Sequence, residues 1–253
     1  MAMQRIELLG VPVDVCRPEQ LEAEILEILS KPGTKQIIFL SVWDVLKARN
    51  KRNDFGQCIK DADLILPISK SILSGARFLK KDVPVRYNPF SAVISVLSVL
   101  DQYYKSLYLL GGRQETLTHA ERNLRETFPN LQIVGRFVGY YPKTMESDII
   151  AAMYKSSPAL VLVSEGIKER NLWSYHRRNQ FSNSIFLYYR DAIGIFSERI
   201  KRVSEATFDR GREIWHEIAH NPFKLFFVFS FIKYGILLVW YRFFRRNAQQ
   251  QDA

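Results

Sequence analysis

The chain has few of the residues that indicate a protein stabilised by disulfide bonds or by bound metal ions. Its 253 residues include only two cysteines, Cys16 and Cys58, which lie far apart without a metal-ligand spacing. This pattern predicts no disulfide framework and no metal site, and we expect two reduced, buried thiols in a cytoplasmic protein. Residues 1–21 contain no apolar stretch of the signal-peptide type, which argues against export.

Internal repeats, low-complexity linkers and basic-aromatic modules of the kind that bind nucleic acid are also missing from the sequence. The pattern therefore predicts no nucleic-acid partner. What is present is a hydrophobic content of 47% and an aromatic content of 13%. These values indicate a globular protein that can bury a sizeable core.

The positive charge of the chain is unevenly distributed. The formal net charge is +10, yet residues 1–166 carry 21 lysines and arginines against 18 acidic residues. Residues 167–253 carry 15 against 8. The basic excess therefore belongs to the C-terminal third, where it suits an anionic lipid surface or a phosphorylated ligand.

A strand–turn–helix–strand pattern organises the middle of the chain. The apolar run 106–110 stops at Gly111-Gly112, and a second apolar run follows at 131–134. Between them, Leu117, Ala120, Leu124 and Phe128 recur at helical spacing. A βαβ unit of this kind predicts parallel, neighbouring strands whose carboxyl ends face a ligand. Gly111, Gly112 and Arg113 would then lie at the ligand edge, although the two glycines could also form only a tight turn.

The rest of the chain keeps alternating between strand and helix. This alternation predicts a Rossmann-like, mostly parallel α/β sheet with flanking helices. We expect it to occupy residues 1–205, followed by a C-terminal helical appendage over residues 206–253. The further strands are expected at 6–9, 11–15, 36–40, 63–66, 159–163 and 184–188, and helices at 18–29, 43–50, 69–79, 89–104, 145–154 and 168–178.

The appendage ends in an oily segment. Residues 225–241 contain a single charge, Lys233. Seventeen residues are at the lower limit for crossing a bilayer, and a central lysine counts against a span. The segment therefore favours a helix lying in the membrane interface, with a core helix or a subunit-interface helix as alternatives. The residues expected to meet the headgroups are Lys224, Trp240, Arg242, Arg245 and Arg246.

Several segments resemble one bacterial protein family in matching order. Residues 109–141, LLGGRQETLTHAERNLRETFPNLQIVGRFVGYY, look like the middle of the WecG/TagA/CpsF glycosyltransferases. DADLILP resembles the strand before the family's acidic loop, and RIKRVS and GREIWHEIAHNP resemble two later segments. LVLVSEGIKERNLW shares Val163, Gly166 and Trp173 with the family motif V-G-x-G-x-P-x-Q-E-x-W. The resemblance covers roughly residues 5–225.

The resemblance implies transfer of an N-acetylhexosamine from a UDP-sugar to a polyprenyl-diphosphate-linked acceptor in cell-surface polysaccharide synthesis. It also implies a metal-independent, inverting reaction with no cofactor beyond the UDP-sugar. The expected location is the inner, cytoplasmic face of the cell membrane, where the appendage meets anionic lipid and completes the active site. Family members further suggest self-association into a homo-oligomer.

The chain departs from the family at four polar positions. The Asp that serves as the proposed general base aligns with Ile68, whose hydrocarbon side chain cannot accept a proton. The family's Thr-x-Asn aligns with Phe39 and Ser41, its Gln-Glu aligns with Arg170-Asn171, and a later Asp aligns near Gly194. Two hypotheses remain: a glycosyltransferase with a relocated base, or a catalytically inactive, membrane-associated partner of other envelope enzymes.

Other residues could replace the missing chemistry. Glu165 and Asp191 each follow a predicted strand and should face the same crevice, where they could divide base and orienting roles. The alternative is that both are helix caps or solvated loop groups. Lys70 at a helix start, and Arg199 and Arg202 in a basic cluster, could hold phosphate or form a solvated face. With Gly111, Gly112, Arg113 and Gly166, they complete the predicted substrate-binding set.

Overall fold

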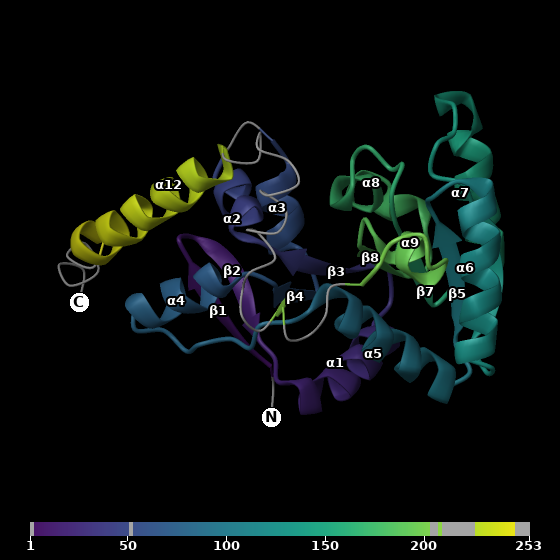
Figure 1. The fold of residues 1–253 in the computed structure, drawn as a ribbon, viewed down its shortest axis with the longest axis horizontal. Helices are drawn as coiled ribbons and strands as arrows, with labels where there is room; N and C mark the ends of the chain where they lie inside the picture. The colour runs from purple at the N-terminus through teal and green to yellow at the C-terminus, as the bar shows by residue number, and fades with distance from the viewer. Residues whose placement is uncertain (1–2, 51–52, 203–206, 209–225, 246–253) are drawn as a thin grey trace.

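The computed structural model describes residues 3–50, 53–202, 207–208 and 226–245. A six-stranded parallel sheet lies at its centre, in the order β4-β3-β8-β7-β5-β6. Figure 1 shows β4, β3, β8, β7 and β5 following one another from left to right. The prediction of a Rossmann-like α/β fold is thereby confirmed. The strands are β3 (Lys35–Leu40), β4 (Leu64–Pro67), β5 (Ser106–Leu110), β6 (Gln132–Phe137), β7 (Leu160–Val163) and β8 (Ile185–Tyr188).

The first two strands form a separate antiparallel hairpin, β1 (Gln4–Leu8) and β2 (Val11–Val15). The fully buried Asp14 fixes this hairpin to the outer strand of the sheet. Its carboxylate accepts hydrogen bonds from Arg5 Nε at 2.6 Å and from the backbone N–H of Ile65 in β4 at 2.7 Å. One open amide of the edge strand is thus satisfied, as an exposed sheet edge requires.

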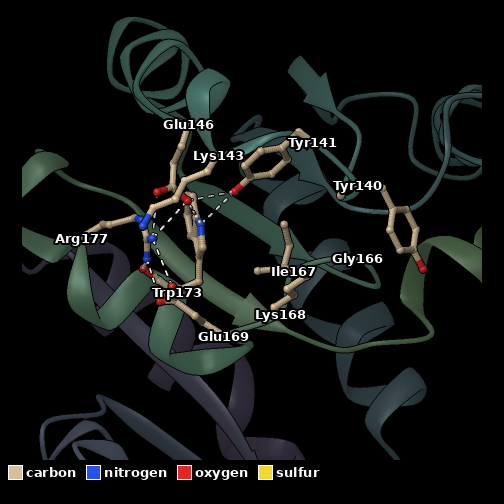
Figure 2. A pocket seen from close by; sticks show the side chains of 11 residues that line it. Tyr140, Tyr141, Lys143, Glu146, Gly166, Ile167, Lys168, Glu169, Trp173 and Arg177 are labelled. Atoms are coloured by element: carbon tan, nitrogen blue, oxygen red, sulfur yellow. Dashed lines mark hydrogen bonds and ion pairs between the residues drawn. The ribbon is translucent and has the colours of Figure 1, made fainter.

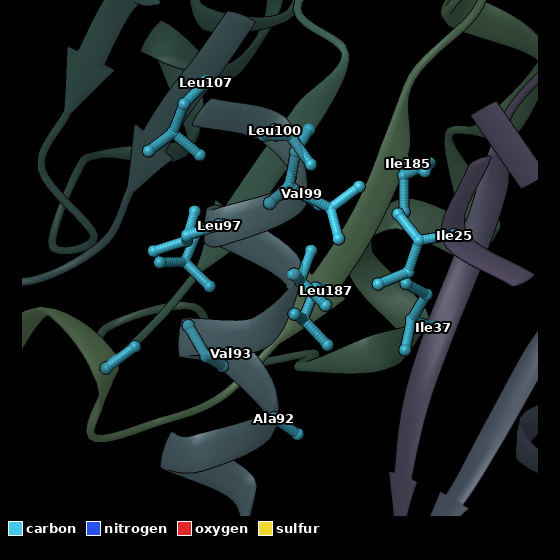
Figure 3. Close-up of a cluster of buried hydrophobic side chains, with 14 of the residues drawn as sticks. Ile25, Ile37, Ala92, Val93, Leu97, Val99, Leu100, Leu107, Ile185 and Leu187 are labelled. Atoms are coloured by element: carbon cyan, nitrogen blue, oxygen red, sulfur yellow. The ribbon is translucent and has the colours of Figure 1, made fainter. Parts of the chain in front are cut away.

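Helices cover both faces of the sheet because successive strand residues point to opposite sides. On one face, α1 (Pro18–Ser30), α5 (Pro89–Gln102), α6 (Gln114–Thr127) and α9 (Ala192–Phe196) enclose a core that includes Ile37, Leu107 and Leu187, drawn in Figure 3. The opposite face carries α2 (Val42–Ala48), α3 (Phe55–Lys60), α4 (Lys70–Phe78), α7 (Glu146–Ser156), α8 (Asn171–His176) and the hairpin.

The connections leave the sheet in opposite directions between β5 and β7. From β5 the chain passes through α6 on the first face to β6, and from β7 it passes through α8 on the second face to β8. The carboxyl ends of β5 and β7 therefore form a topological switch point, where sheets of this class bind ligands.

The observed elements differ from the predicted ones mainly at their ends and in short helices. The sequence pattern did not predict α3, whose six residues include Gly56, and the helix expected at 168–178 is shortened to α8. The proposed domain boundary at 205/206 and much of the appendage lie outside the described residues. The last described elements are α12 (Phe226–Trp240) and a π-helical turn, Tyr241–Arg245.

Candidate functional site

The loops after β5, β6 and β7 meet at the switch point through their backbones. The N–H of Gly111 donates to Phe137 O at 2.9 Å, and the N–H of Gly112 donates to Glu165 O at 2.8 Å. The N–H of Gly139 donates to Gly112 O at 2.9 Å. The predicted glycine pair therefore holds three loops together with its amides, and its contact with a ligand stays a prediction.

Glycine is required where these loops touch. Gly166 has φ +94°, and a Cβ there would lie 2.7 Å from the carbonyl carbon of Gly139. We expect Gly166→Ala to lower the free energy of unfolding by about 2–4 kcal/mol, through backbone strain and overpacking. In thermal unfolding this corresponds to a decrease in Tm of about 4–16 °C. Gly33→Ala is the control, because Gly33 has φ +83° but open space around it. Gly33→Ala should lower the free energy of unfolding by only about 1 kcal/mol, through backbone strain alone. Equal effects of the two variants would mean that the contact between Gly166 and Gly139 does not require glycine.

A pocket of about 440 Å³ opens beside this junction, on the face that carries α7 and α8 (Figure 2). Most of its walls come from the segments that follow β6 and β7. Its lining residues are Gly139, Tyr140, Tyr141, Lys143, Glu146, Gly166, Ile167, Lys168, Glu169, Trp173 and Arg177.

Arg177 organises the inner wall of the pocket. Its guanidinium contacts both carboxylate oxygens of Glu146 at 3.0 Å and Glu169 Oε2 at 3.0 Å. Only 12% of the Arg177 side chain and 20% of the Glu146 side chain are exposed, so this pairing is largely shielded from water. The Arg177 hydrogen bond is the leading cause that lowers the pKa of Glu169. One arginine thus bridges two carboxylates, and its hydrogen bond favours the ionised form of Glu169.

Two aromatic side chains are fixed to the same carboxylate. The indole N–H of Trp173 lies 3.0 Å from both Glu146 Oε1 and the Tyr141 hydroxyl oxygen. Burial and the neighbouring Glu146 carboxylate raise the pKa of Tyr141 to about 12, so its phenol stays protonated. Figure 2 shows these rings on the inner wall, while the Tyr140 ring lies apart on the far side of Ile167. The pocket therefore has a rigid polar-aromatic wall.

The charge that the pocket leaves uncompensated is positive. Glu146 and Glu169 are paired with Arg177, whereas Lys143 and Lys168 form no ion pair with any described residue. The Arg113 guanidinium adds a further cation near the outer wall, 5.9 Å from the centre of the Tyr140 ring. An anionic ligand with an aromatic or ring-shaped part is the chemistry that such walls accommodate.

The predicted carboxylates lie on adjacent strand ends, as expected. The N–H of Glu165 donates to Arg190 O at 3.0 Å, which joins the loops after β7 and β8. Each carboxylate also forms an ion pair: Glu165 with Arg199, and Asp191 with Arg190 at 3.0 Å. Burial is the leading cause that raises the pKa of Tyr188; the charges of Arg170 and Arg190 oppose it, and the Asp191 and Glu165 carboxylates add to it. The structure thus brings Glu165, Asp191 and Arg199 together beside Gly166.

The remaining predicted residues are more widely spread. Lys70 begins α4 at the carboxyl end of β4, separated from β7 by β3 and β8. Arg202 is exposed at the end of a described segment. At the four replaced positions, Ile68 packs partly against the core, Phe39 is buried, and Gly194 is in contact range of Ile200. Arg170 has φ 54° and ψ −125°, a strained backbone for a residue with a side chain.

Sequence reasoning missed the residues of the inner wall. Arg177 lies between His176 and Arg178 in a short basic run, yet its guanidinium lies on the inner wall of the pocket while Arg178 is exposed. Tyr140 and Tyr141 were treated only as the end of the resembling segment. The signal that could have found them is an aromatic pair directly after a strand and a glycine, at an edge where ligands bind.

Helix α12 packs on the body through one side only (Figure 1). Tyr234 is buried and its hydroxyl donates to Ser71 O in α4 at 3.1 Å, while Arg242 contacts Phe78 O and its guanidinium lies 4.6 Å from the Phe78 ring centre. Lys224 and Arg246 lie outside the described residues. The side away from the body, termed the outer face, exposes Phe229, Ile232, Ile236, Val239, Trp240, Phe243 and Phe244.

Two negative findings apply to the described residues alone. None of the helices there combines the length and apolar character needed to cross a membrane. Within the same ranges, no three His, Cys, Asp or Glu side chains gather as they would around a metal ion.

Comparison with known proteins identifies the family of this fold and site. Residues 6–252 match the model of the "Glycosyl transferase WecG/TagA/CpsF family". An N-acetylglucosaminyldiphosphoundecaprenol N-acetyl-beta-D-mannosaminyltransferase of Bacillus subtilis (strain 168) is 19% identical over 197 residues, 78% of this chain and 76% of the relative. The enzyme of the same name from Staphylococcus aureus (strain NCTC 8325 / PS 47) is 18% identical over 199 residues, 78% of each chain. The chain belongs to the WecG/TagA/CpsF glycosyltransferase family.

Proposed function

We propose that this protein transfers an N-acetylhexosamine from a UDP-sugar to a polyprenyl-diphosphate-linked acceptor at the inner face of the cell membrane. The observation that carries the proposal is the pocket beside the β5–β7 switch point, in a chain whose family consists of glycosyltransferases. The names of the two relatives specify transfer of an N-acetylmannosaminyl group to an N-acetylglucosaminyldiphosphoundecaprenol acceptor.

The donor fits the pocket by its chemistry. The nucleoside of a UDP-sugar offers a ring and hydroxyl groups to Tyr140, Tyr141 and the Gly166 loop. Its diphosphate would lie at the cationic outer side, where Lys168, Arg113 and Arg199 are exposed. In transfer, the acceptor oxygen forms a bond to the anomeric carbon, the bond from that carbon to phosphate breaks, and UDP leaves with the electron pair. Positive side chains beside the leaving diphosphate stabilise the charge that develops on it.

Glu165 and Asp191 are the catalytic candidates on this edge. Each is already bound to an arginine, which favours an orienting role: Glu165 holds Arg199, and Asp191 holds Arg190. We expect Glu165→Gln to reduce kcat at least about tenfold, because an unanchored Arg199 is less well placed to offset the charge of UDP. Steady-state transfer kinetics measure this. Glu126→Gln on the exposed side of α6 is the control and should leave kcat unchanged. An unchanged kcat in Glu165→Gln would remove this residue from the mechanism.

The outer face of α12 supports the membrane part of the proposal. Its seven exposed apolar side chains include Trp240 and two phenylalanines at the carboxyl end, and the sequence from 226 to 245 contains no acidic residue. A helix of this type lies in the headgroup region of an anionic bilayer. The appendage of residues 206–253 would thereby hold the active-site edge near a lipid-linked acceptor. Self-association through the same face is the competing proposal.

One specific observation favours a second candidate function. Three residues at the replaced family positions pack into or against the interior: Phe39 is 7% exposed, the half-buried Ile68 packs against the core, and Gly194 is buried. A chain of this kind could keep the fold and the outer face of α12 while acting as an inactive partner of other envelope enzymes.

The test combines donor binding with turnover. Full-length protein is titrated calorimetrically with a panel of UDP-N-acetylhexosamines, and transfer to polyprenyl-diphosphate-linked N-acetylglucosamine is measured in anionic vesicles. We expect saturable binding of a UDP-sugar and formation of the lengthened lipid. Binding without transfer to this acceptor would favour the inactive partner. Absence of binding across the whole panel would contradict the proposed donor site.

A further inference from the structure

A third carboxylate, Asp44, lies at the same edge of the sheet as Glu165 and Asp191. It occupies the first turn of α2, directly after β3, and β3 lies between β4 and β8. Because all six strands are parallel, the carboxyl end of β3 is continuous with those of β8 and β7. The first turn of α2 therefore borders the edge that carries the pocket.

The side chain of Asp44 is turned back toward the end of β3. Its Oδ2 atom accepts hydrogen bonds from the Ser41 backbone N–H at 2.8 Å and from the Ser41 hydroxyl at 2.5 Å. Within the described parts of the chain, its other oxygen, Oδ1, accepts no hydrogen bond and Asp44 forms no ion pair. Asp44 thus differs from Glu165 and Asp191, whose carboxylates are each paired with an arginine.

Asp44 is a neighbour of the position where the family's base is missing. The N–H of Ile68 donates to Leu40 O at 2.9 Å, and the N–H of Val42 lies 3.4 Å from the Ser69 hydroxyl oxygen. These contacts join the chain after β4 to the first turn of α2. A carboxylate at residue 44 therefore lies one strand away from residue 68, on the same side of the sheet edge.

The segment 168–170 connects Asp44 with the donor pocket. Lys168 and Glu169 line the pocket, and the charge of Arg170, the next residue, acts on both Asp44 and Tyr188. Arg170 is held at φ 54°, so its backbone is constrained at this point. Arg170 therefore follows two pocket residues in sequence and lies close enough to Asp44 for its charge to act there.

We propose that Asp44 is the relocated general base of this chain, accepting the proton of the acceptor hydroxyl as that oxygen attacks the anomeric carbon. The proton moves to Oδ1, the oxygen forms the new glycosidic bond, and the bond to the UDP phosphate breaks. The inference rests on the proposed glycosyltransferase function. Burial is the leading cause that raises the pKa of Asp44, opposed by the two Ser41 hydrogen bonds and by the charges of Lys47 and Arg170. A raised pKa suits a base that works near neutral pH.

The competing role of Asp44 is purely structural, since Ser41 and Asp44 form a capping box at the start of α2. Asp44→Gln separates the two roles, because glutamine at this position preserves a capping box but cannot accept the proton. The matched control is Ser41→Ala, which removes the hydroxyl from the box and keeps the carboxylate.

We expect Asp44→Gln to reduce kcat at least about 100-fold, with the donor KM within about threefold and with Tm close to that of the unaltered protein. The activity of the unaltered enzyme should decrease as pH falls through the pKa of Asp44. The residual activity of Asp44→Gln should not show this decrease. Ser41→Ala should lower Tm more than kcat. If the unaltered protein is active and Asp44→Gln retains its kcat, or if both variants lose activity only in proportion to stability, Asp44 is not the base. If the unaltered protein binds donor but transfers nothing, the proposed function and this assignment both fail.

Discussion

Replacing Arg177 with methionine is expected to lower the free energy of unfolding by about 3–5 kcal/mol, because it strands the Glu146 carboxylate inside the pocket wall. The Glu146 side chain is 20% exposed and receives its two charged hydrogen bonds from Arg177. Glu169 is 43% exposed, so water can replace most of the hydrogen bonding that this carboxylate loses with Arg177. Thermal unfolding should show a decrease in Tm of about 6–20 °C.

The neighbouring arginine supplies the control for this prediction. Arg178 is exposed and, among the described residues, its guanidinium donates only to Tyr175 O, so Arg178→Met should change stability by less than about 1 kcal/mol. Adding Glu146→Gln to Arg177→Met should restore part of the loss, since the stranded charge is then removed. Equal stability of the two arginine variants would mean that the inner wall does not depend on this pairing.

The same variant should change how stability depends on pH. Arg177 is the main cause that lowers the pKa of Glu169 in the folded protein below its ordinary value of 4.5. The folded state then binds fewer protons than the unfolded state, so this contribution is present above pH 4.5 and is lost as pH falls through the folded pKa. Arg177→Met should flatten the acid side of a plot of Tm against pH, whereas an unchanged slope would exclude this linkage.

Replacing two isoleucines on the outer face of α12 with aspartate is expected to weaken binding to anionic vesicles at least about 100-fold. Ile232 and Ile236 are 53% and 64% exposed and lie one turn apart. Each isoleucine side chain removed from the lipid weakens the free energy of membrane binding by about 1.5–3 kcal/mol. The new negative charges are also repelled by anionic headgroups. Vesicle co-sedimentation with phosphatidylglycerol-containing liposomes compares Ile232→Asp/Ile236→Asp with the unaltered protein.

Tyr154→Asp is the control for surface charge, because Tyr154 is 57% exposed on α7 and belongs to a different surface. It should leave vesicle binding within about threefold. Sedimentation velocity of the same variants without lipid distinguishes membrane binding from self-association through the outer face. If the double variant dissociates an oligomer and binds vesicles as before, the outer face is a subunit interface rather than a membrane surface.

The alternation of apolar strands and amphipathic helices was sufficient to predict the parallel sheet. Strands such as β5 and β7 are short and almost wholly apolar, and Gly111 and Ser164 end these two apolar runs at the observed strand boundaries. The sequence could not predict that β1 and β2 form their own hairpin, because this depends on the buried contacts of Asp14 with Arg5 and Ile65. Those contacts join residues up to 51 positions apart.

The candidate pocket lies beside the strand ends that the sequence singled out, but the residues of its inner wall were not predicted. Glu165 and Gly166 lie at the switch point because a strand precedes them, which is visible in the sequence. The opposite orientations of Arg177 and Arg178 are not visible there, since both belong to one short basic run. Only the three-dimensional placement of Glu146, contributed by α7, shows which arginine is inside. Asp44 could not be singled out from the sequence either, because an acidic residue in the first turn of a helix is normally interpreted as part of the helix cap.

Hydrogen–deuterium exchange with and without a UDP-N-acetylhexosamine tests most directly whether the donor binds beside the β5–β7 switch point. We expect added protection in residues 138–143 and 164–170, with little change in β1, β2 and α1. Donor-dependent protection confined to other segments, at a concentration where calorimetry shows saturation, would contradict it.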